Sequence, residues 1–274
     1  MCGRFSLSSD PARLALELDA IDEASSPPPG LVPSEGPRSP RFNIAPTTSI
    51  GVLALDVPRE RLQDAAPAPD RVLRAMRWGL VPSWARDAKK LPNLFNARVE
   101  TAFEKPSFRA AVKRRHCVIP MDGWYEWVPG VPASAGGKAG PKQPFHMSLP
   151  GDQGLLMAGL WEARRDPDDE SITQLSCTIL TTDAVGPLRR VHDRMPLVVA
   201  PDILDDWLDP DVIGDRAHWS MEQVQTWNSG LRRWRFDLCR DWSPTSATMA
   251  LSLCAQSTRP RECSSEQSRQ HIGT

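Results

Sequence analysis

The second residue of the chain is a cysteine, and its place next to Met1 is the first sign of chemistry in the sequence. Removal of Met1 would leave Cys2 with a free thiol and the α-amine of the chain. An α-amine has a reference pKa of about 7.7 to 8.0, so part of it is unprotonated at neutral pH and can form an imine with a carbonyl group. Two nucleophiles on one residue therefore predict covalent chemistry. The alternative is a cysteine without function that happens to stand near the chain end.

A carboxyl group among aromatic residues is the second candidate. Glu126 stands in the run Trp124, Tyr125, Glu126, Trp127. An apolar wall disfavours the charged form of a carboxyl group and raises its pKa toward neutrality. A carboxyl group tuned in this way can act as a general acid and base at neutral pH. The alternative is a solvated carboxylate on a strand.

Short strands must position these groups, because β-branched and apolar runs alternate with turn-forming segments along the chain. Strands are expected within residues 41–55, 72–84, 116–127, 145–149, 154–163 and 175–183. Short helices are expected within residues 10–20, 103–114 and 201–209, and surface loops at 25–40, 64–70 and 128–144. With no βαβ rhythm and no repeat, the pattern predicts an α+β fold. We expect a single domain with a mixed, mainly antiparallel, barrel-like β core flanked by short helices.

Composition excludes several classes of protein. A chain of 274 residues, of which 40% are hydrophobic and 24% charged, can bury a sizeable core. No stretch approaches about 18 uninterrupted apolar residues and the N-terminus lacks a signal-peptide pattern, so we expect a cytoplasmic protein with no membrane partner. The six cysteines show neither CxxC pairs nor histidines at ligand spacing. This predicts reduced thiols, no metal site and no cofactor.

Arginine outnumbers lysine by 27 to 6, although the net charge is only -1. The planar fork of arginine suits phosphate better than the point charge of lysine. A GC-rich genome, whose codons favour arginine, alanine and proline, would explain the number equally well. The positions of the arginines must therefore carry the argument, and several stand in the motif-like runs CGR, MRWG, NARVE and HDRMP.

Eight short runs along residues 2–214 together resemble the SRAP family, the proteins that shield abasic sites in single-stranded DNA. The runs are MCGRF, FNIAPT, RWGLVPSWA, FNARVET, KPSFR, RRHCVIPMDGWYEW, AGLWE and VHDRMP. Each run alone is a weak signal, but the family order over about two hundred residues is hard to obtain by chance. The resemblance implies a monomer whose partner is single-stranded DNA containing abasic sites. It also implies nucleoid association when DNA is bound, a lyase-like activity and a self-processing peptidase activity.

An abasic site exposes an aldehyde, which gives Cys2 a specific role. Condensation of the amine and the thiol on the aldehyde carbon closes a five-membered thiazolidine ring. Only an N-terminal cysteine can do this, because the nitrogen of an internal residue is tied up in a peptide bond. The resemblance therefore implies a covalent cross-link through Cys2 that shields the lesion.

The resemblance implies three further catalytic residues. Asn96 would lie beside Cys2 and hold the amine or a sugar oxygen without charge. Glu126 would transfer protons when the sugar ring opens, and His192 would assist proton transfer and Schiff-base chemistry near the sugar.

A second group of residues would bind the strand. Arginines would contact phosphates on either side of the lesion, and aromatic rings would stack on bases or wedge where the strand kinks. Proline and glycine would shape the loops that the strand approaches. These residues are Arg4, Arg77, Arg98, Arg194, Trp78, Trp127, Pro46 and Gly79. We assign Trp84 and Trp161 to the core, and His116, His146, His218 and His271 to structural or surface positions.

The C-terminal segment, residues 215–274, differs in kind from the SRAP-like catalytic domain expected over residues 2–214. It holds three of the six cysteines and four of the ten tryptophans, and it ends in a tail rich in serine, arginine and glutamine. We expect this segment to be irregular, either a disordered extension or the product of a shifted reading frame, and to carry no site residue.

Two alternative functions come from other classes. N-terminal-nucleophile amidotransferases also begin Met-Cys-Gly, but they usually show a hydrophobic residue where this chain has Arg4, and no NGEIYN-like or GDGE-like segment follows. A non-covalent module that binds single-stranded DNA would use the same basic groove and aromatic residues. For such a module, Cys2→Ala would leave all function intact, so a trapped covalent complex separates these alternatives.

Overall fold

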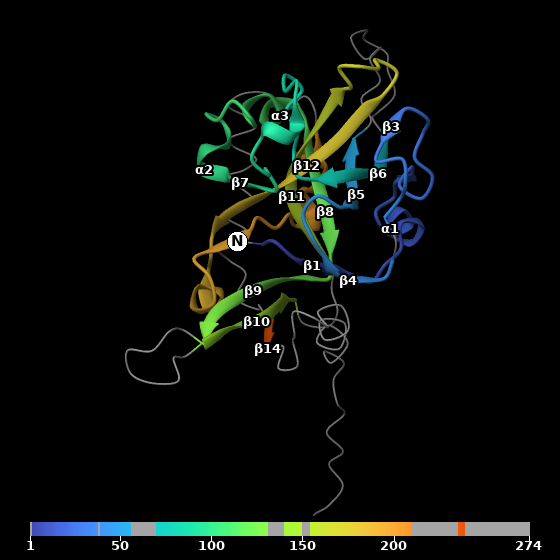
Figure 1. Ribbon diagram of the computed structural model, residues 1–274. Helices are drawn as coiled ribbons and strands as arrows, with labels where there is room; N and C mark the ends of the chain where they lie inside the picture. The colour runs from blue at the N-terminus through green and yellow to red at the C-terminus, as the bar shows by residue number, and fades with distance from the viewer. Residues whose placement is uncertain are drawn as a thin grey trace, which may run out of the picture.

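Five strands close into a barrel in the computed structural model, which describes residues 2–37, 39–55, 70–130, 140–149, 154–209 and 235–238 (Figure 1). The strands are β5 (Ser49–Leu55), β6 (Arg71–Trp78), β8 (His116–Met121), β11 (Leu155–Arg165) and β12 (Thr173–Asp183). Four of the five pairings around the ring are antiparallel, and the fifth, between β6 and β12, is parallel. The expected α+β class with a mixed, mainly antiparallel, barrel-like core is confirmed.

The barrel closes because its strands are buried over most of their length. All eight residues from Leu175 to Thr182 on β12 are buried. Gly159 on β11 permits the close packing, since a Cβ there would lie 2.4 Å from Ile119 Cδ1 and 2.9 Å from Cys117 Sγ. The parallel contact that closes the ring pairs Cys177 with Trp78.

A second sheet lies against the barrel in the order β14, β10, β9, β1, β4. Its strands are β1 (Phe5–Leu7), β4 (Arg41–Ile44), β9 (Gly123–Gly130), β10 (Gly140–Ser148) and β14 (Arg235–Leu238). The chain passes from β8 of the barrel to β9 through Asp122, whose carboxylate accepts a hydrogen bond from the Ser8 amide at 2.8 Å. The start of the chain is thereby fixed beside β9.

Short strands extend the barrel at its edges. β7 (Asn96–Arg98) and β13 (Arg194–Pro196) both pair with the last residues of β12. β2 (Ile21–Asp22) pairs with β6, and β3 (Leu31–Val32) pairs with the first residues of β12. β3 falls within residues 25–40, which the sequence predicts as a loop. Within that range, Leu31 and Val32 are the residues that pair with another strand, β12.

The helices are short and lie outside the sheets. The α-helices are α1 (Pro11–Glu17), α2 (Val99–Ala102), α3 (Arg109–Arg114) and α4 (Leu204–Leu208), and the 3-10 helices are η1 (Ala88–Lys90), η3 (Gly186–Arg190) and η4 (Pro201–Ile203). The Asp10 side chain caps α1 by accepting from the Arg13 amide at 2.9 Å. The helix expected within 103–114 is shorter than that range because Pro106 cannot occupy a helix interior.

Most of residues 215–274 lies outside the described residues. The part that is described, β14, pairs antiparallel with β10, so that Phe145 lies opposite Leu238. This tetrapeptide of the expected irregular tail is therefore a strand. The boundary at residue 214 stays a prediction.

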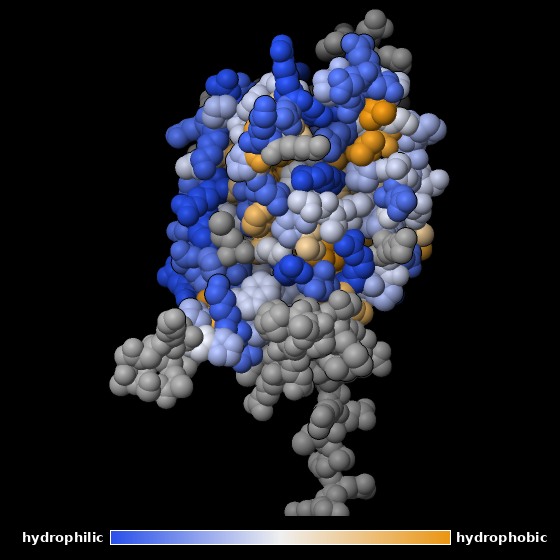
Figure 2. Space-filling view, viewed as in Figure 1, coloured by the Kyte–Doolittle hydropathy of each residue, from blue (hydrophilic) through white to orange (hydrophobic). Residues whose placement is uncertain are grey.

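The face of the molecule in Figure 2 is largely hydrophilic, with small apolar patches. The large apolar side chains exposed in the described part of the chain are Leu16, Ile21, Val32 and Trp84. No described helix has the length and apolar character needed to cross a membrane.

Candidate active site at the start of the chain

The pairing of β1 with β9 brings the start of the chain next to Glu126. Phe5 lies opposite Trp124, and the Tyr125 amide donates to the Arg4 carbonyl at 2.9 Å. This contact lies one residue from Glu126 and two residues from Cys2. Cys2 and Glu126 are both buried, with 0% and 3% of their surfaces exposed.

Asn96 reaches the same point from the barrel. β7 runs parallel to β12, with Asn96 opposite Ile179. The Asn96 Nδ2 atom donates to the Cys2 carbonyl at 2.7 Å. The Asn96 Oδ1 atom is buried and accepts no hydrogen bond from any residue that the structure describes. Asn96 thus fixes the backbone of Cys2 and keeps an acceptor for another group.

Burial shifts the pKa values of both ionisable groups at this point. Desolvation raises the pKa of the Cys2 thiol well above its ordinary value, and the negative charge of Glu126 raises it further. Desolvation also raises the pKa of Glu126 to about 7, although the charge of the amino terminus acts in the opposite direction. At neutral pH the thiol is therefore protonated, while both forms of the carboxyl group are populated.

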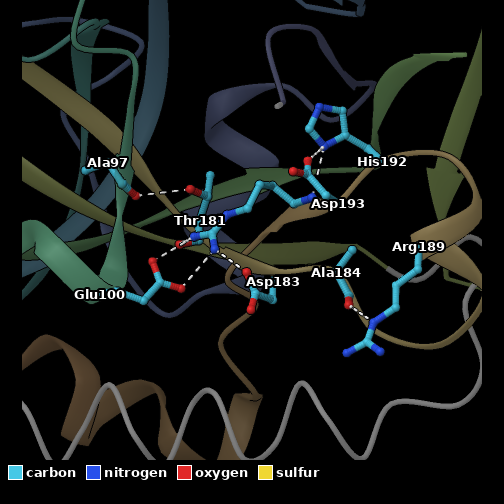
Figure 3. Close-up of polar contacts among 9 residues, drawn as sticks. Ala97, Glu100, Thr181, Asp183, Ala184, Arg189, His192 and Asp193 are labelled. Carbon is cyan, nitrogen blue, oxygen red and sulfur yellow. Dashed lines mark hydrogen bonds and ion pairs between the residues drawn. The ribbon is translucent and has the colours of Figure 1, made fainter. Parts of the chain in front are cut away.

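His192 lies in the turn that precedes β13 (Figure 3). Its Nδ1 atom accepts from the Arg194 amide at 2.9 Å and lies 2.7 Å from Asp193 Oδ1. One nitrogen cannot serve both contacts at once, so a neutral ring accepts from the amide and a protonated ring donates to the carboxylate. Partial burial lowers the pKa of His192, as does the charge of the amino terminus, and Asp193 opposes both effects.

Contacts and charge effects link these residues in pairs. Asn96 donates to the Cys2 carbonyl at 2.7 Å, the charge of Glu126 raises the pKa of the Cys2 thiol, and the charge of Asp193, the neighbour of His192, raises the pKa of Glu126.

Arg194 does not join this group, and its expected phosphate contact is withdrawn. Its guanidinium donates to both oxygens of Glu100 at 2.9 Å, to Asp183 Oδ1 at 2.5 Å and to the Thr181 carbonyl at 2.7 Å (Figure 3). Only 8% of the side chain is exposed. An arginine held on this many acceptors ties the protein together and offers no free face to a phosphate.

Trp78 is also corrected, because it has no exposed surface. Its Nε1 atom donates to the Phe95 carbonyl at 2.9 Å, and its ring packs edge-on against Phe5 and Phe95. Stacking on a nucleotide base requires an open ring face, so the stacking role of Trp78 is withdrawn. Trp127, the other expected stacking residue, is half-buried on β9.

Trp84 was expected in the core, but 59% of its surface is exposed. Its loop is nevertheless firmly held. Arg164, which is buried on β11, donates to the Ala85 carbonyl at 2.6 Å and to the Arg86 carbonyl at 2.9 Å. An exposed ring on a fixed loop is a feature that the sequence did not distinguish from a core tryptophan.

The remaining predicted arginines differ in their access to solvent. Arg98 is exposed at the end of β7. Arg4 is half-buried and donates to Asn43 Oδ1 at 2.7 Å. Arg77 is half-buried and donates to the Gly79 carbonyl at 2.5 Å, and desolvation lowers its pKa. Arg98 is therefore the most accessible of these three residues.

The two loop-shaping residues lie in turns. Pro46 is half-buried in the turn between β4 and β5, just before Thr47 with its φ of 73°. Gly79 has a φ of 133°, and a Cβ there would lie 2.6 Å from Asn93 Oδ1. Both the backbone angle and the close contact require glycine at position 79.

The two other histidines in the described residues, His116 and His146, make buried contacts within the protein. His116 contacts the carbonyls of Val112 and Trp207 at 2.8 and 2.9 Å and stacks on the Trp207 ring. His146 is buried, with its Nε2 atom 3.0 Å from Ser6 Oγ. No group of three or more metal-ligating side chains occurs in the part of the chain that is described. His218 and His271 lie outside that part.

Comparisons with known proteins found a matching family model and several relatives. The family model described as "SOS response associated peptidase (SRAP)" matches residues 1–232. Abasic site processing protein YoqW of Bacillus subtilis is 34% identical over 210 residues, which cover 77% of this chain and 81% of that protein. Abasic site processing protein HMCES of Gallus gallus is 30% identical over 232 residues, covering 76% of this chain and 66% of that protein.

Solved structures share the fold. A protein from Bacteroides thetaiotaomicron matches with a TM-score of 0.64 at 18% identity, covering 88% of this chain and 93% of that one. A phage-related protein from Bordetella bronchiseptica matches with a TM-score of 0.55 at 26% identity, covering 88% of this chain and 95% of that one.

Proposed function

Because the chain belongs to the SOS response associated peptidase (SRAP) family, we propose that it captures abasic sites in single-stranded DNA through Cys2 after Met1 is removed. Relatives that carry the name abasic site processing protein support the lesion as the substrate. Two observations around Cys2 support the covalent step. Asn96 binds the Cys2 carbonyl at 2.7 Å, while burial raises the pKa of Glu126 beside the thiol to about 7.

The first step joins the α-amine of Cys2 to the aldehyde of the opened sugar. The nitrogen lone pair forms the bond to carbon, and the carbonyl oxygen takes a proton to give a carbinolamine. Loss of one water then gives an imine. Protonated Glu126 donates the proton that the leaving hydroxyl needs, and a pKa of about 7 keeps that form populated at neutral pH.

The second step closes the ring. The Cys2 thiol adds across the carbon–nitrogen double bond, forming the sulfur–carbon bond while the nitrogen gains a proton. Because burial keeps the thiol protonated, a base must remove its proton as the sulfur attacks, and ionised Glu126 is the base at this point. The product is protein plus DNA minus one water.

Two neighbouring side chains assist these steps. The unoccupied Asn96 Oδ1 atom accepts a hydrogen bond from the attacking amine or from a sugar hydroxyl. Since burial lowers the pKa of His192, its ring is neutral at pH 7 and can take up the proton released when the closed sugar opens.

The DNA strand would bind across the site through arginine and tryptophan side chains. Exposed Arg98 contacts a phosphate, and half-buried Arg4 and Arg77 contribute positive charge behind it. Trp84, which is exposed on its fixed loop, would stack on a base in place of the buried Trp78. Trp127 on β9 and Pro46 in the β4–β5 turn would line the path of the strand. We propose that a monomer does this and associates with DNA in the cell.

The test is incubation of the purified protein with a single-stranded oligonucleotide that contains one abasic site, followed by denaturing gel and mass spectrometry. We expect a heat-stable adduct with the mass of protein lacking Met1 plus DNA minus one water. Cys2→Ala should abolish it, and Cys2→Ser should give at most a labile linkage. Cys117→Ala is the matched control and should keep full capture, because the nitrogen of Cys117 is in a peptide bond.

Each alternative has its own outcome in this experiment. Undiminished, heat-stable capture by Cys2→Ala would refute the thiazolidine mechanism. Tight binding by both proteins with no adduct would identify a non-covalent binding module. Release of ammonia from glutamine by the wild type alone would identify an amidotransferase.

A further inference from the structure

We propose that Arg189 and Arg190 form a phosphate clamp beside His192, which holds the DNA strand across β12 from Arg98. The inference rests on the proposed function and adds a contact that the sequence motifs do not indicate. Both residues end η3, the 3-10 helix over Gly186–Arg190, and both are exposed. The ion pairs among the described residues include neither arginine.

Arg189 is held in place without losing its anion-binding atoms. Its Nε atom donates to the Ala184 carbonyl at 2.6 Å, and Figure 3 shows both Nη atoms pointing away from that contact. A guanidinium fixed through Nε loses less conformational entropy when it binds an anion. Its two Nη groups present the fork that matches two phosphate oxygens.

The turn that carries the two arginines is fixed relative to His192. The His192 amide donates to the Leu188 carbonyl at 3.1 Å, and the Ala184 amide donates to the Asp193 carbonyl at 2.8 Å. Leu188 is buried, with 3% of its surface exposed. A phosphate bound by Arg189 and Arg190 therefore lies close to the sugar on which His192 would act.

Neither neighbouring acid forms an ion pair with the two arginines. Asp183 pairs with Arg194 at 2.5 Å, and Asp193 lies 2.7 Å from the His192 ring. The positive charge of Arg189 and Arg190 stays available to a polyanion.

The position of the turn gives the clamp a direction. At the end of β12, Thr181 pairs with Arg98 of β7 along one edge and with Pro196 of β13 along the other. η3 leads into β13, so its arginines and Arg98 lie beyond opposite edges of β12. A strand passing over Cys2 would meet Arg98 on one side and the clamp on the other.

The experiment measures binding of an intact single-stranded oligonucleotide by fluorescence anisotropy over a range of salt concentrations. The variants are Arg189→Gln, Arg190→Gln and their combination, with exposed Arg165→Gln, at the opposite end of β12, as the matched control. Each clamp variant should reduce the slope of log affinity against log salt by about 0.7, and the combination by about 1.4. Arg165→Gln should leave the slope unchanged.

A second measurement locates the contact. Single neutral methylphosphonate linkages are placed in turn on each side of an abasic site, and the adduct rate is measured below saturation. The wild type should slow at linkages on both sides, whereas the double variant should no longer respond to a linkage on one side. Capture at saturating DNA should remain complete.

The outcomes separate the clamp from the proposed function. A wild type that forms no adduct would refute the proposed function. A wild type that forms the adduct, with clamp variants whose salt slopes equal that of Arg165→Gln, would overturn the clamp alone. A double variant that stays sensitive to neutral linkages on both sides would do the same.

Discussion

Two regions of the molecule, one around Cys2 and one around Arg194, bury ionisable groups. The surroundings of these groups differ in how far they stabilise the charged form. Around Cys2, burial raises the pKa of Glu126 to about 7, and the charge of the amino terminus offsets this only in part. Around Arg194, two carboxylates and a carbonyl surround the guanidinium, and its pKa is raised despite burial. The partly compensated carboxyl group of Glu126 keeps a proton that can move near neutral pH. The ion pairs of Arg194 hold segments of the chain together, although its buried Nε atom has no hydrogen-bond partner among the described residues.

The ion pair between Arg194 and Glu100 also helps to position the region around Cys2. Glu100 lies in α2, four residues after Asn96, and Arg194 lies two residues after His192. The contact between Glu100 and Arg194 at 2.9 Å therefore joins the segments that carry two proposed catalytic residues.

The comparison is tested most strongly by Glu126→Gln, which should stabilise the protein at alkaline pH. The pKa of Glu126 is raised from 4.5 to about 7 in the folded protein. The folded state therefore binds this proton more tightly, and the stability it contributes below pH 4.5 is lost as the pH rises to about 7. The loss amounts to roughly 3 kcal/mol at pH 8, as an upper value. Glutamine does not ionise, so the variant should not lose this stability as the pH rises.

The measurement is urea unfolding of both proteins at pH 4 and pH 8. The two should agree at pH 4, and the variant should be more stable at pH 8, while exposed Glu104→Gln changes neither value. Adduct formation by Glu126→Gln should slow by about 10²-fold, because general acid and base catalysis is lost while the amine still reacts. A variant that is less stable at pH 8 would contradict the comparison.

Arg194→Ala should have the opposite effect on stability. Removal of one partner from a buried ion pair typically costs about 3 to 5 kcal/mol. Here Glu100 and Asp183 are 43% and 79% exposed and can be solvated, so we expect a loss of about 1 to 3 kcal/mol. Urea unfolding at pH 7 measures it, with Arg165→Ala as the control.

Arg194→Lys sharpens this result. Lysine keeps the charge but cannot bind both oxygens of Glu100, so only part of the stability should return. If Arg194→Ala kept wild-type stability and lost only DNA affinity, Arg194 would be a phosphate contact after all.

The sequence predicted the fold class and gathered Cys2, Asn96, Glu126 and His192 as candidates, and a hydrogen bond of 2.7 Å joins Asn96 to the Cys2 carbonyl. Asn96 and Cys2 are 94 residues apart, and they meet through the pairing of β7 with β12 and of β1 with β9. No local pattern encodes such a contact. The expectation that Asn96 lies beside Cys2 came from the family resemblance that the order of the motifs carries. The roles of the four residues stay proposals.

Burial is what the sequence did not predict. Trp78 ends a strand whose neighbour β12 closes the barrel over it, while Trp84 lies six residues later in a loop that projects to solvent. Both stand in the same motif, and their ring chemistry is identical. Arg194 likewise differs from exposed Arg98 only through the distant acids Glu100 and Asp183. Such differences depend on contacts between segments far apart in the chain.

The smallest expected effect is that of Asp193→Asn, which removes an exposed charge between the two regions. The negative charge of Asp193 raises the pKa of His192 by attraction and raises the pKa of Glu126 by repulsion. Without it, both pKa values should fall slightly, since the Asp193 side chain is 84% exposed and its charge is well screened. The pH profile of single-turnover adduct formation should therefore move to lower pH between pH 5 and 9, with its maximum height unchanged. Asp206→Asn, an exposed aspartate on α4, should leave the profile in place. A shift to higher pH would show that Asp193 does not act on these groups through its charge.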